Sequence, residues 1–459
     1  MLTTLPNFST QLSPFQSVPS ITIAFSGGVD SRVLLRNVSL WAKENDCLDR
    51  VNAVYIHHGL SVNSEIWAEK CQLWAEDEGI ICYVERVDVS QDKGVSVEQE
   101  ARNARYQALT PYVKPGGILV TGQHADDQVE TFILALKRGS GPAGLASMPY
   151  QLSFAEGQII RPLLTYSRQE IEVYAQQHRL QWVEDESNQD NKYDRNFLRN
   201  TLIPQFVDRW PGWKKAVNRT AKLCGEQEHL LNELTADKLQ QAIFKDGSLQ
   251  IDSLVRLSDA LSRRLVRDWI KQKKQLENSN ITLPSEAQLQ QIFHSVIDAK
   301  PDANPQVCWG DIQVRRYQNR LYIVENLPSI EDLVIDIQLD KWVRLPENLG
   351  EIRLQHRPFG DGNLRLPIEL NEETQTALSP ITIRFNGSGI AIKPVGRQGK
   401  RKLKKLYQEY GVPSWLRKRT PLLFYGENLV SVADLFENSA FVGLDCQLYW
   451  RRTICDTKE

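Results

Sequence analysis

The sequence has no run of about 18 consecutive apolar residues, which is the length that a membrane-spanning helix needs. Its first twenty residues contain no Lys, Arg, Asp or Glu and no apolar core, so they lack the features of a secretory signal and of an organelle transit peptide. Its seven cysteines form no Cys-x-x-Cys pair, which argues against a zinc ribbon, a paired redox site or a disulfide framework. These absences predict a reduced, cytoplasmic protein without membrane contact.

The composition is that of an ordinary globular protein. Apolar residues make up 41% and charged residues 24% of the 459 positions, which excludes a wholly disordered chain and a collagen-like one. At about 150 residues per domain, this length predicts three domains, with two as the alternative. No internal repeat and no low-complexity tract occurs.

The net charge of -2 conceals a local excess of positive charge. Residues 393–419, which we call the basic cluster, contain ten Lys or Arg and a single acid, Glu409. A local patch of this kind attracts polyanions whatever the charge of the whole chain. The alternative is a solvated basic helix face.

Short apolar segments alternate with helical segments between residues 21 and 137. The predicted strands are 21–25, 51–56, 80–87 and 118–121, and the predicted helices are 29–43, 65–78, 96–110 and 125–137. Strands separated by helices predict a doubly wound α/β fold with a parallel sheet. In such folds ligands bind outside the carboxyl ends of the strands.

The remainder of the chain predicts two further domains. A strand at 159–160, a capping box from Ser167 to Glu170 and a turn at 210–213 complete the first domain, whereas helices at 216–239, 254–274 and 286–298 indicate a mostly helical second one. Short apolar segments at 381–385 and 429–433 indicate an α+β third domain. The predicted borders are an N-terminal extension without assigned role at 1–20 and domains at 21–213, 214–330 and 335–459.

The segment Ser26-Gly-Gly-Val-Asp-Ser31 lies directly between a buried strand and a helix. Two glycines allow the backbone to approach a ligand, and the free N–H groups at the helix start favour an anion. The loop lacks the glycine spacing and the lysine of a Walker loop, so cleavage between the α and β phosphates of ATP suits it better than γ-phosphoryl transfer. The predicted ATP-binding residues are Ser26, Gly27, Gly28, Val29, Asp30 and Ser31. The alternative is a plain strand–turn–helix.

Asp30 needs its own explanation, because a carboxylate repels bound phosphates. It either caps the helix or binds the Mg²⁺ that accompanies the nucleotide. We favour the second role.

Three carboxylates begin the helix at 125–137. Asp126 and Asp127 lie four and three residues before Glu130, so both pairs share a helix face and repel each other. A charged amine or Mg²⁺ would relieve this repulsion. A solvated acidic helix start is the alternative, which the helix dipole also favours. His124, just before the helix, is either part of the site or a structural histidine.

The phosphate loop resembles the signature of the N-type ATP pyrophosphatases, or PP-loop proteins, which split ATP into AMP and pyrophosphate while adenylating an oxygen. Further motifs narrow the resemblance to the tRNA(Ile)-lysidine synthetases in their long, three-domain form, over nearly the whole chain after about residue 20. These motifs are His57-His-Gly-Leu60, His124-Ala-Asp-Asp-Gln-Val-Glu-Thr131, Lys137-Arg-Gly-Ser-Gly-Pro-Ala-Gly-Leu145, Glu184-Asp-Glu-Ser-Asn188, Asp194-Arg-Asn-Phe-Leu-Arg199, Arg401-Lys-Leu-Lys-Lys405, Gly411-Val-Pro413, Trp415-Leu-Arg417 and Pro421-Leu-Leu-Phe-Tyr-Gly426.

The resemblance implies an ATP-dependent ligase that joins free L-lysine to C2 of the wobble cytidine in the CAU anticodon of tRNA(Ile). The reaction would pass through an adenylated cytidine and give lysidine, AMP and pyrophosphate, which changes codon reading from AUG to AUA. ATP with Mg²⁺, L-lysine and tRNA(Ile) are the implied ligands. The oligomeric state stays open, with a homodimer as one option.

The resemblance also implies roles for individual residues. Asp127 and Glu130 would handle lysine, and Asp30 would act beside the phosphates. Arg105, with Arg102, either forms salt bridges within its helix, as in the pair Glu98–Arg102, or neutralises charge that develops during adenylation. Two groups of basic residues would contact the tRNA backbone. They are Arg195 and Arg199, spaced for one helix face, and Arg401, Lys402, Lys404 and Lys405.

Three other functions compete with this interpretation. A PP-loop tRNA sulfur-transfer enzyme commonly needs paired cysteines or an iron–sulfur cluster, which the sequence does not provide. An amino-acid or amide ligase of nucleotide metabolism would not need the basic cluster. A non-catalytic RNA-binding protein would not need an intact phosphate loop.

Overall fold

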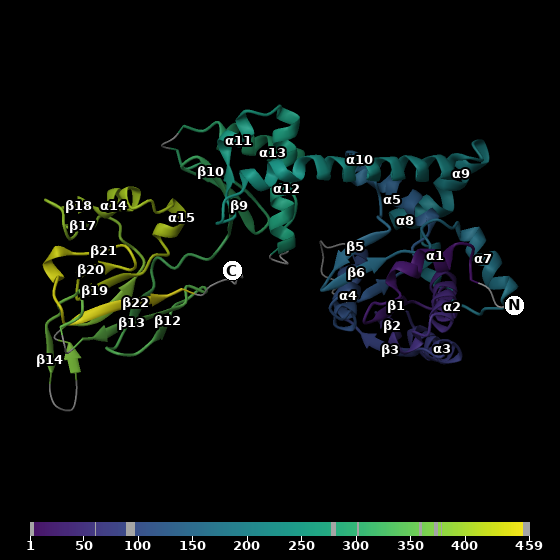
Figure 1. Cartoon of the computed structure of the whole chain (residues 1–459), viewed down its shortest axis with the longest axis horizontal. Helices are drawn as coiled ribbons and strands as arrows, with labels where there is room; N and C mark the ends of the chain where they lie inside the picture. Colours follow the sequence, from purple (N-terminus) through teal and green to yellow (C-terminus); the bar gives the residue numbers. More distant parts are fainter. Residues whose placement is uncertain are drawn as a thin grey trace. The chain divides into compact units, whose positions relative to one another are not determined.

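The computed structural model describes residues 4–59, 61–88, 97–276, 281–300, 303–357, 360–370, 375–377 and 379–452. The chain divides into two compact units, Met1–Leu234 and Thr235–Glu459 (Figure 1). None of the helices in the described ranges is long and apolar enough to cross a lipid bilayer. The motif His57-His-Gly-Leu60 extends beyond these ranges at Leu60, and the side chain of Glu98, the predicted partner of Arg102, is not described.

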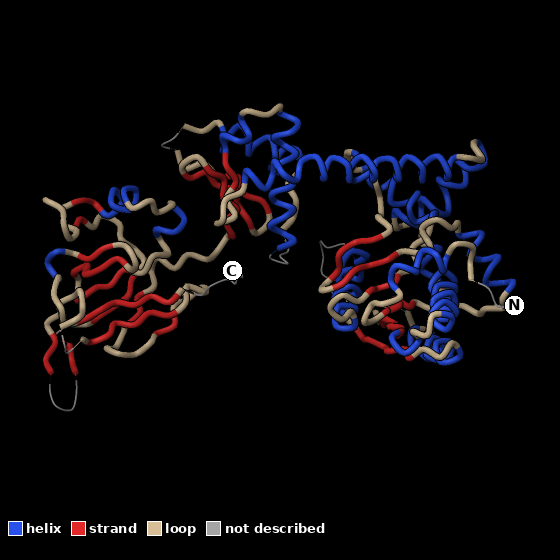
Figure 2. The backbone as a smooth tube through the Cα atoms, in the orientation of Figure 1, coloured by secondary structure: helices blue, strands red, loops and turns tan. Residues whose placement is uncertain are grey.

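The first unit is built on a six-stranded sheet with the order β3-β2-β1-β4-β6-β5. Five strands run parallel and β5 pairs with β6 in the antiparallel sense, which confirms the predicted doubly wound fold. Figure 2 shows the strands in red and the helices in blue. The strands are β1 Ile21–Phe25, β2 Val51–His57, β3 Ile81–Arg86, β4 Ile118–Val120, β5 Gln151–Phe154 and β6 Gly157–Ile160.

Helices cover both faces of this sheet (Figure 1). Because side chains alternate along a strand, Ile23 of β1 and Ile118 of β4 join the core beneath one helical layer, whereas Leu119 joins the core beneath the other. The first layer contains α2 Val29–Glu44, α3 Ser64–Asp77 and α7 Arg168–Gln177, and the second contains α4 Val97–Leu109. Burial on both faces explains why the inner strands β1, β2 and β4 are largely apolar runs rather than alternating ones.

The N-terminal segment is part of the same core. Leu5, Phe8 and Leu12 are buried against the first helical layer, and the Leu5 N–H donates to Asn37 Oδ1 at 2.6 Å. Phe8 and Leu12 lie on the short helix α1 Phe8–Leu12. Residues 4–20, for which the sequence predicted no role, therefore contribute to the core beneath the first helical layer.

The hairpin of β5 and β6 is larger than the short strand predicted at 159–160. Its turn places Ala155 in the left-handed region, with φ of 49°. Asparagine or glycine is the usual residue for this conformation, so the sequence carries no ordinary hairpin signal here. The turn is held instead by pairing of Phe154 with Gly157 across the hairpin.

The helix α10, Trp213–Ala242, begins in the first unit and ends in the second. It is followed by α11 Ile251–Val255, α12 Asp259–Leu276 and α13 Glu286–Gln291, the last of which continues as a π-helix at Ile292–Ile297. The helix predicted at 254–274 is therefore divided between α11 and α12, which residues 256–258 separate. This part is helical as predicted, but it also contains an unpredicted antiparallel sheet with the order β7-β10-β9-β8. Its strands are β7 Leu249–Gln250, β8 Gln306–Trp309, β9 Ile312–Tyr317 and β10 Arg320–Glu325.

Antiparallel sheets form the last part of the chain, which confirms the predicted α+β character. A five-stranded sheet has the order β11-β16-β19-β20-β21, and a three-stranded sheet has the order β12-β13-β22. Their strands are β11 Val334–Asp336, β12 Val343–Arg344, β13 Glu351–His356, β16 Ile381–Arg384, β19 Leu422–Tyr425, β20 Asn428–Val432, β21 Phe436–Glu437 and β22 Cys446–Arg451. Two-stranded ribbons, β14 Ile368–Leu370 with β15 Gln375–Ala377 and β17 Ala391–Ile392 with β18 Arg401–Lys402, and the helices α14 Leu403–Glu409 and α15 Ser414–Arg417 complete this part.

Candidate active site

The phosphate loop leaves the start of α2 open. Gly27 has a φ of 79°, and Gly28 is the N-cap of α2 in an extended conformation without a side-chain cap. The first N–H groups of a helix have no partner inside the helix, so they are available to an anion. Ser31 is buried and its hydroxyl donates to Gly28 O at 3.0 Å while accepting the Ser26 N–H at 3.2 Å. Ser31 therefore holds the loop closed, and Ser26 presents the more available hydroxyl.

Two other segments frame this loop. The Val183 N–H donates to Gly27 O at 3.0 Å. Gly122, which follows β4, approaches α2 so closely that a Cβ there would lie 3.3 Å from the Ser31 nitrogen. The carboxyl end of β4 is thereby held against the start of α2, as a ligand site at the carboxyl ends of the strands requires.

Asp30 lies in the first turn of α2 and does not cap it, because Gly28 is the N-cap. One carboxylate oxygen, Oδ2, accepts from Arg168 Nη1 at 2.6 Å. The other, Oδ1, lies 3.5 Å from His124 Nε2, is buried and has no hydrogen-bond partner among the described residues. Burial raises the pKa of Asp30, although His124 and Arg168 act in the opposite direction. Of the two roles considered for this residue, helix capping is excluded.

His124 connects the phosphate loop to the acidic helix α5, Ala125–Lys137. Its Nδ1 accepts the Asp126 N–H at 3.2 Å, and its own backbone N–H donates to Asp127 Oδ2 at 3.0 Å, which completes a capping box. With Nδ1 accepting, the neutral ring carries its proton on Nε2, which faces Asp30. His124 therefore has a structural role, and it lies between Asp30 of the phosphate loop and Asp127 of α5.

The acidic face of α5 is balanced by the protein's own cations. Arg199 binds Glu130 through two hydrogen bonds of 2.7 and 3.0 Å and lies 3.4 Å from Asp127 Oδ1. Lys214, on α10, binds Asp126 Oδ1, and the Arg168 N–H donates to Asp126 Oδ2 at 2.8 Å. Of the three carboxylates, Asp127 keeps the least engaged oxygen.

Burial dominates the electrostatics of the Glu130–Arg199 pair. Glu130 is only 1% exposed, and burial raises its pKa against the opposing effect of Arg199. Burial also opposes the charge of Arg199, yet the hydrogen bonds to Glu130 raise the Arg199 pKa. A forked guanidinium on a carboxylate favours the ionised pair, so removal of Arg199 would leave the buried Glu130 carboxylate without a partner.

Arg195 and Arg199 do not share a regular helix face. Arg195 lies on α8, Asp194–Phe197, whereas Arg199 lies in a π-helical turn, Leu198–Leu202, that leads into α9, Ile203–Arg209. Arg199 is paired with Glu130 and Asp127, and 40% of its side chain is exposed. The positive charge of Arg195 also acts on Glu130.

Arg105, on α4, contacts His58 rather than the phosphate loop. Its Nε and Nη2 lie 3.4 and 3.3 Å from His58 Nε2, just after the carboxyl end of β2. Burial, together with the charge of Arg105, lowers the pKa of His58 to about 4, so the neutral imidazole can accept from Arg105. Arg102 packs on the ring of Tyr106 instead.

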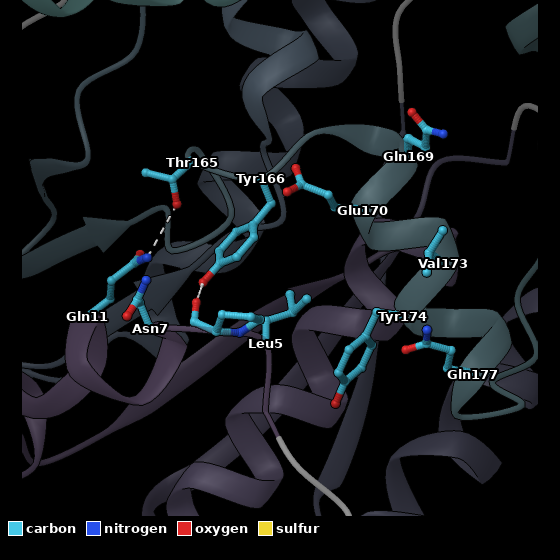
Figure 3. Close-up of a pocket in the computed structure, with 11 residues that line it drawn as sticks. Leu5, Asn7, Gln11, Thr165, Tyr166, Gln169, Glu170, Val173, Tyr174 and Gln177 are labelled. Atoms are coloured by element: carbon cyan, nitrogen blue, oxygen red, sulfur yellow. Dashed lines mark hydrogen bonds between the residues drawn. The ribbon is translucent and has the colours of Figure 1, made fainter.

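A groove of about 720 Å³ lies beside α7 and the N-terminal segment (Figure 3). Gln11, Tyr166 and Val173 are among its lining residues, and Gln11 Nε2 donates to Thr165 Oγ1 at 3.4 Å. Its acidic residue, Glu170, caps α7 by accepting the Ser167 N–H at 2.7 Å. The groove includes no residue of the phosphate loop or of α5, so we assign no substrate to it.

The basic cluster presents lysines on one side of α14. Leu403 and Leu406 are buried, whereas Lys402, Lys404 and Lys405 are exposed and have no carboxylate within 4.0 Å among the residues that the structure describes. Arg401 differs from these lysines, because it shares Glu409 with Arg397 and binds it at 3.2 Å. Its charge is therefore already partly compensated.

The fold and the open phosphate loop define a PP-loop nucleotide-binding protein. Family models agree: a PP-loop domain matches residues 4–206, a TilS substrate binding domain matches 249–322, and a TilS substrate C-terminal domain matches 381–452. The tRNA(Ile)-lysidine synthase of Photobacterium profundum is 50% identical over 428 residues, covering 93% of this chain and 94% of that protein. The tRNA(Ile)-lysidine synthase of Vibrio parahaemolyticus is 46% identical over 443 residues, covering 96% and 97%. The chain belongs to the tRNA(Ile)-lysidine synthase family.

Proposed function

We propose that this chain joins free L-lysine to C2 of the wobble cytidine in tRNA(Ile) with a CAU anticodon, at the expense of ATP. Its membership of the family supports these substrates. The contact chain Asp30–His124–Asp127 is the observation that carries the proposal, because it joins an open phosphate loop to a carboxylate that can bind an amine. A nucleotide and an amine bound at these two points would be neighbours.

In the first step, the C2 oxygen of the cytosine attacks the α-phosphorus of ATP. A bond forms between this oxygen and phosphorus, the bond from phosphorus to the β-phosphate oxygen breaks, and pyrophosphate leaves with the electron pair. The N–H groups of Gly27, Gly28 and the first turn of α2 would stabilise the negative charge of the leaving group. The cytosine must leave the stack of the anticodon loop to reach this site.

Arg105 would act in the same step. Since the pKa of His58 is lowered to about 4, the neutral imidazole holds the guanidinium by hydrogen bonds without adding a competing positive charge. We assign Arg105 to neutralise charge on the adenylated base as it forms.

Asp30 fits the role of a magnesium ligand. Mg²⁺ in nucleotide sites commonly takes one or two carboxylate oxygens and completes its shell with phosphate oxygens and water. The buried Oδ1 of Asp30 lacks a hydrogen-bond partner among the described residues, whereas Arg168 holds Oδ2 in place. An ion held there would supply positive charge beside the phosphates.

In the second step, the lysine amine attacks C2 of the adenylated cytidine. A C–N bond forms, the C–O bond to AMP breaks, AMP leaves with the electron pair, and a carboxylate of the site takes the proton that the amine releases. Asp127 has the least engaged carboxylate oxygen, because its Oδ1 has only a contact of 3.4 Å with Arg199 Nη2, whereas both oxygens of Asp126 and of Glu130 accept shorter hydrogen bonds. We assign Asp127 to the lysine amine and Glu130 to holding Arg199 beside it.

Omission of one substrate at a time tests the proposal. With ATP, lysine and unmodified tRNA(Ile) present, we expect release of pyrophosphate and transfer of labelled lysine to the tRNA. Pyrophosphate release should stop when the tRNA is omitted, because the base is the nucleophile. Release that depends on lysine alone would indicate an amino-acid ligase, and no release under any condition would indicate a non-catalytic RNA-binding protein.

Replacement of Lys402, Lys404 and Lys405 together by Gln should flatten the salt dependence of tRNA binding. For each phosphate that the variant no longer neutralises, the slope of log K against log salt should fall by roughly 0.7 to 0.9. Binding isotherms at several salt concentrations measure this slope. Lys418→Gln is the matched control, since Lys418 is already paired with Glu331. An unchanged slope in the triple variant would remove the three lysines from the interface.

A further inference from the structure

One face of the three-stranded sheet β12-β13-β22 has no role in the proposed reaction. In its antiparallel register Arg353 pairs with Tyr449, whereas Ile352 pairs with Trp450. Ile352 and Leu354 belong to the core, with Trp450 packed against it. Because side chains alternate along a strand, Arg353, Tyr449 and Arg451 lie on the opposite face.

Aromatic and guanidinium planes meet on this outer face. Trp342 lies just before β12. The guanidinium of Arg451 is 4.5 Å from the centroid of the Trp342 ring, and the guanidinium of Arg353 is 5.3 Å from it. Together with Gln355 and Trp450 they line a hollow of about 500 Å³, to which Tyr449 also contributes. We call Trp342, Arg353, Tyr449 and Arg451 the Trp342 platform.

The charge of this platform is not compensated. Arg353 and Arg451 have no carboxylate within 4.0 Å among the residues described, although Glu351 lies opposite Arg451 in the register. The Nε of Arg353 is buried and has no hydrogen-bond partner within the described ranges. Arg357, which lies over Tyr449, is by contrast paired with Asp361 at 3.3 Å.

We propose that the Trp342 platform binds an unpaired nucleotide of the RNA substrate. Unpaired bases stack on aromatic rings and guanidinium planes, and arginine binds phosphate oxygens through its forked N–H groups. A base within a duplex has both faces covered by its neighbours, so only an unpaired base can use this surface. Two guanidinium groups without a carboxylate partner favour a polyanion over a protein as the ligand. The inference depends on the proposed function in one respect only, namely that the RNA is a tRNA.

Binding of short RNAs to the full-length chain tests this inference. The probes are a single-stranded oligoribonucleotide and a blunt duplex of equal length. Stacking of a base contributes about 1–3 kcal/mol, so Trp342→Ala should weaken single-strand binding roughly 5- to 150-fold and leave duplex binding unchanged. Trp342→Phe should restore most of the loss, because it retains a ring.

The matched control is Arg452→Gln. Arg452 also lies over a tryptophan, Trp450, but it is paired with Asp434 at 3.3 Å and is not one of the residues that line the hollow. This variant should bind both probes as the wild type does. Equal weakening of both probes by Trp342→Ala, or no weakening of either, would overturn the inference, the second result favouring a protein partner. Because binding is measured without ATP or lysine, failure of the ligase reaction would not affect the outcome.

Discussion

Replacement of Asp127 by Asn should raise the KM for lysine by roughly 10- to 150-fold, since a hydrogen bond to a charged group contributes about 1.5–3 kcal/mol. The pyrophosphate release that depends on tRNA should persist, because adenylation precedes the entry of the amine. Asn keeps the shape of the side chain and can still accept the His124 N–H that Asp127 Oδ2 accepts at 3.0 Å. Transfer of labelled lysine and release of pyrophosphate, measured side by side, separate the two steps.

Asp126→Asn is the control for this prediction. Asp126 is on the same helix, but Lys214 and the Arg168 N–H already engage both of its oxygens. Its replacement should therefore lower stability more than it changes the KM for lysine. A wild-type KM in Asp127→Asn would exclude Asp127 from lysine binding and transfer the role to Glu130.

Replacement of Gly27 by Ala should destabilise the first unit and abolish ATP binding. The φ of 79° costs a non-glycine residue about 1–2 kcal/mol. The new Cβ would also lie 2.8 Å from Cys71 Sγ and 2.9 Å from Val183 Cγ2. Overpacking of this kind costs about 1–3 kcal/mol, so thermal unfolding should begin several degrees lower than in the wild type.

Gly28→Ala separates the stability effect from the effect on the ligand. The φ of Gly28 is -67°, which any residue adopts, and the nearest atom to a Cβ there is Ser26 Oγ at 3.7 Å. Its melting temperature should stay close to that of the wild type. Its affinity for ATP should still fall, because a methyl group enters the space through which the loop approaches the phosphates. Equal melting temperatures for Gly27→Ala and Gly28→Ala would show that a side chain at position 27 causes neither the backbone strain nor the overpacking described above.

Local patterns were sufficient to predict the parallel sheet and its helices. The helix predicted at 125–137 coincides with α5, and the one at 29–43 differs from α2 by a single residue. The reason is physical, because strands buried on both faces and capped amphipathic helices each produce a signal within about fifteen residues. Of the four strands missed in the second unit, β8 to β10 are joined by two-residue turns at 310–311 and 318–319, so a local hairpin signal was present and was not used. Only β7 pairs with a strand that is distant in sequence, because helices separate it from β10.

The same limit explains what the sequence could not predict about the site. The carboxylates of α5 indicated that a cation was needed, but not that Arg199 and Lys214 would supply it. Arg168 reaches Asp30 from 138 residues away, and no local spacing encodes such a pair. The prediction of one basic helix face assumed a regular helix, in which the four-residue spacing would place Arg195 and Arg199 on the same side, whereas a π-helical turn occurs there. Contact of these residues with the tRNA stays a prediction.

The central claim is that the phosphate loop directs ATP cleavage so that the C2 oxygen of the cytosine becomes bonded to the α-phosphorus. A tRNA(Ile) that carries ¹⁸O at C2 of the wobble cytidine tests this most directly, with mass analysis of the nucleotide formed. The account predicts AMP with one ¹⁸O for each lysidine made, because attack by the amine breaks the bond between C2 and this oxygen. Accumulation of ADP, or AMP without the label, would contradict it.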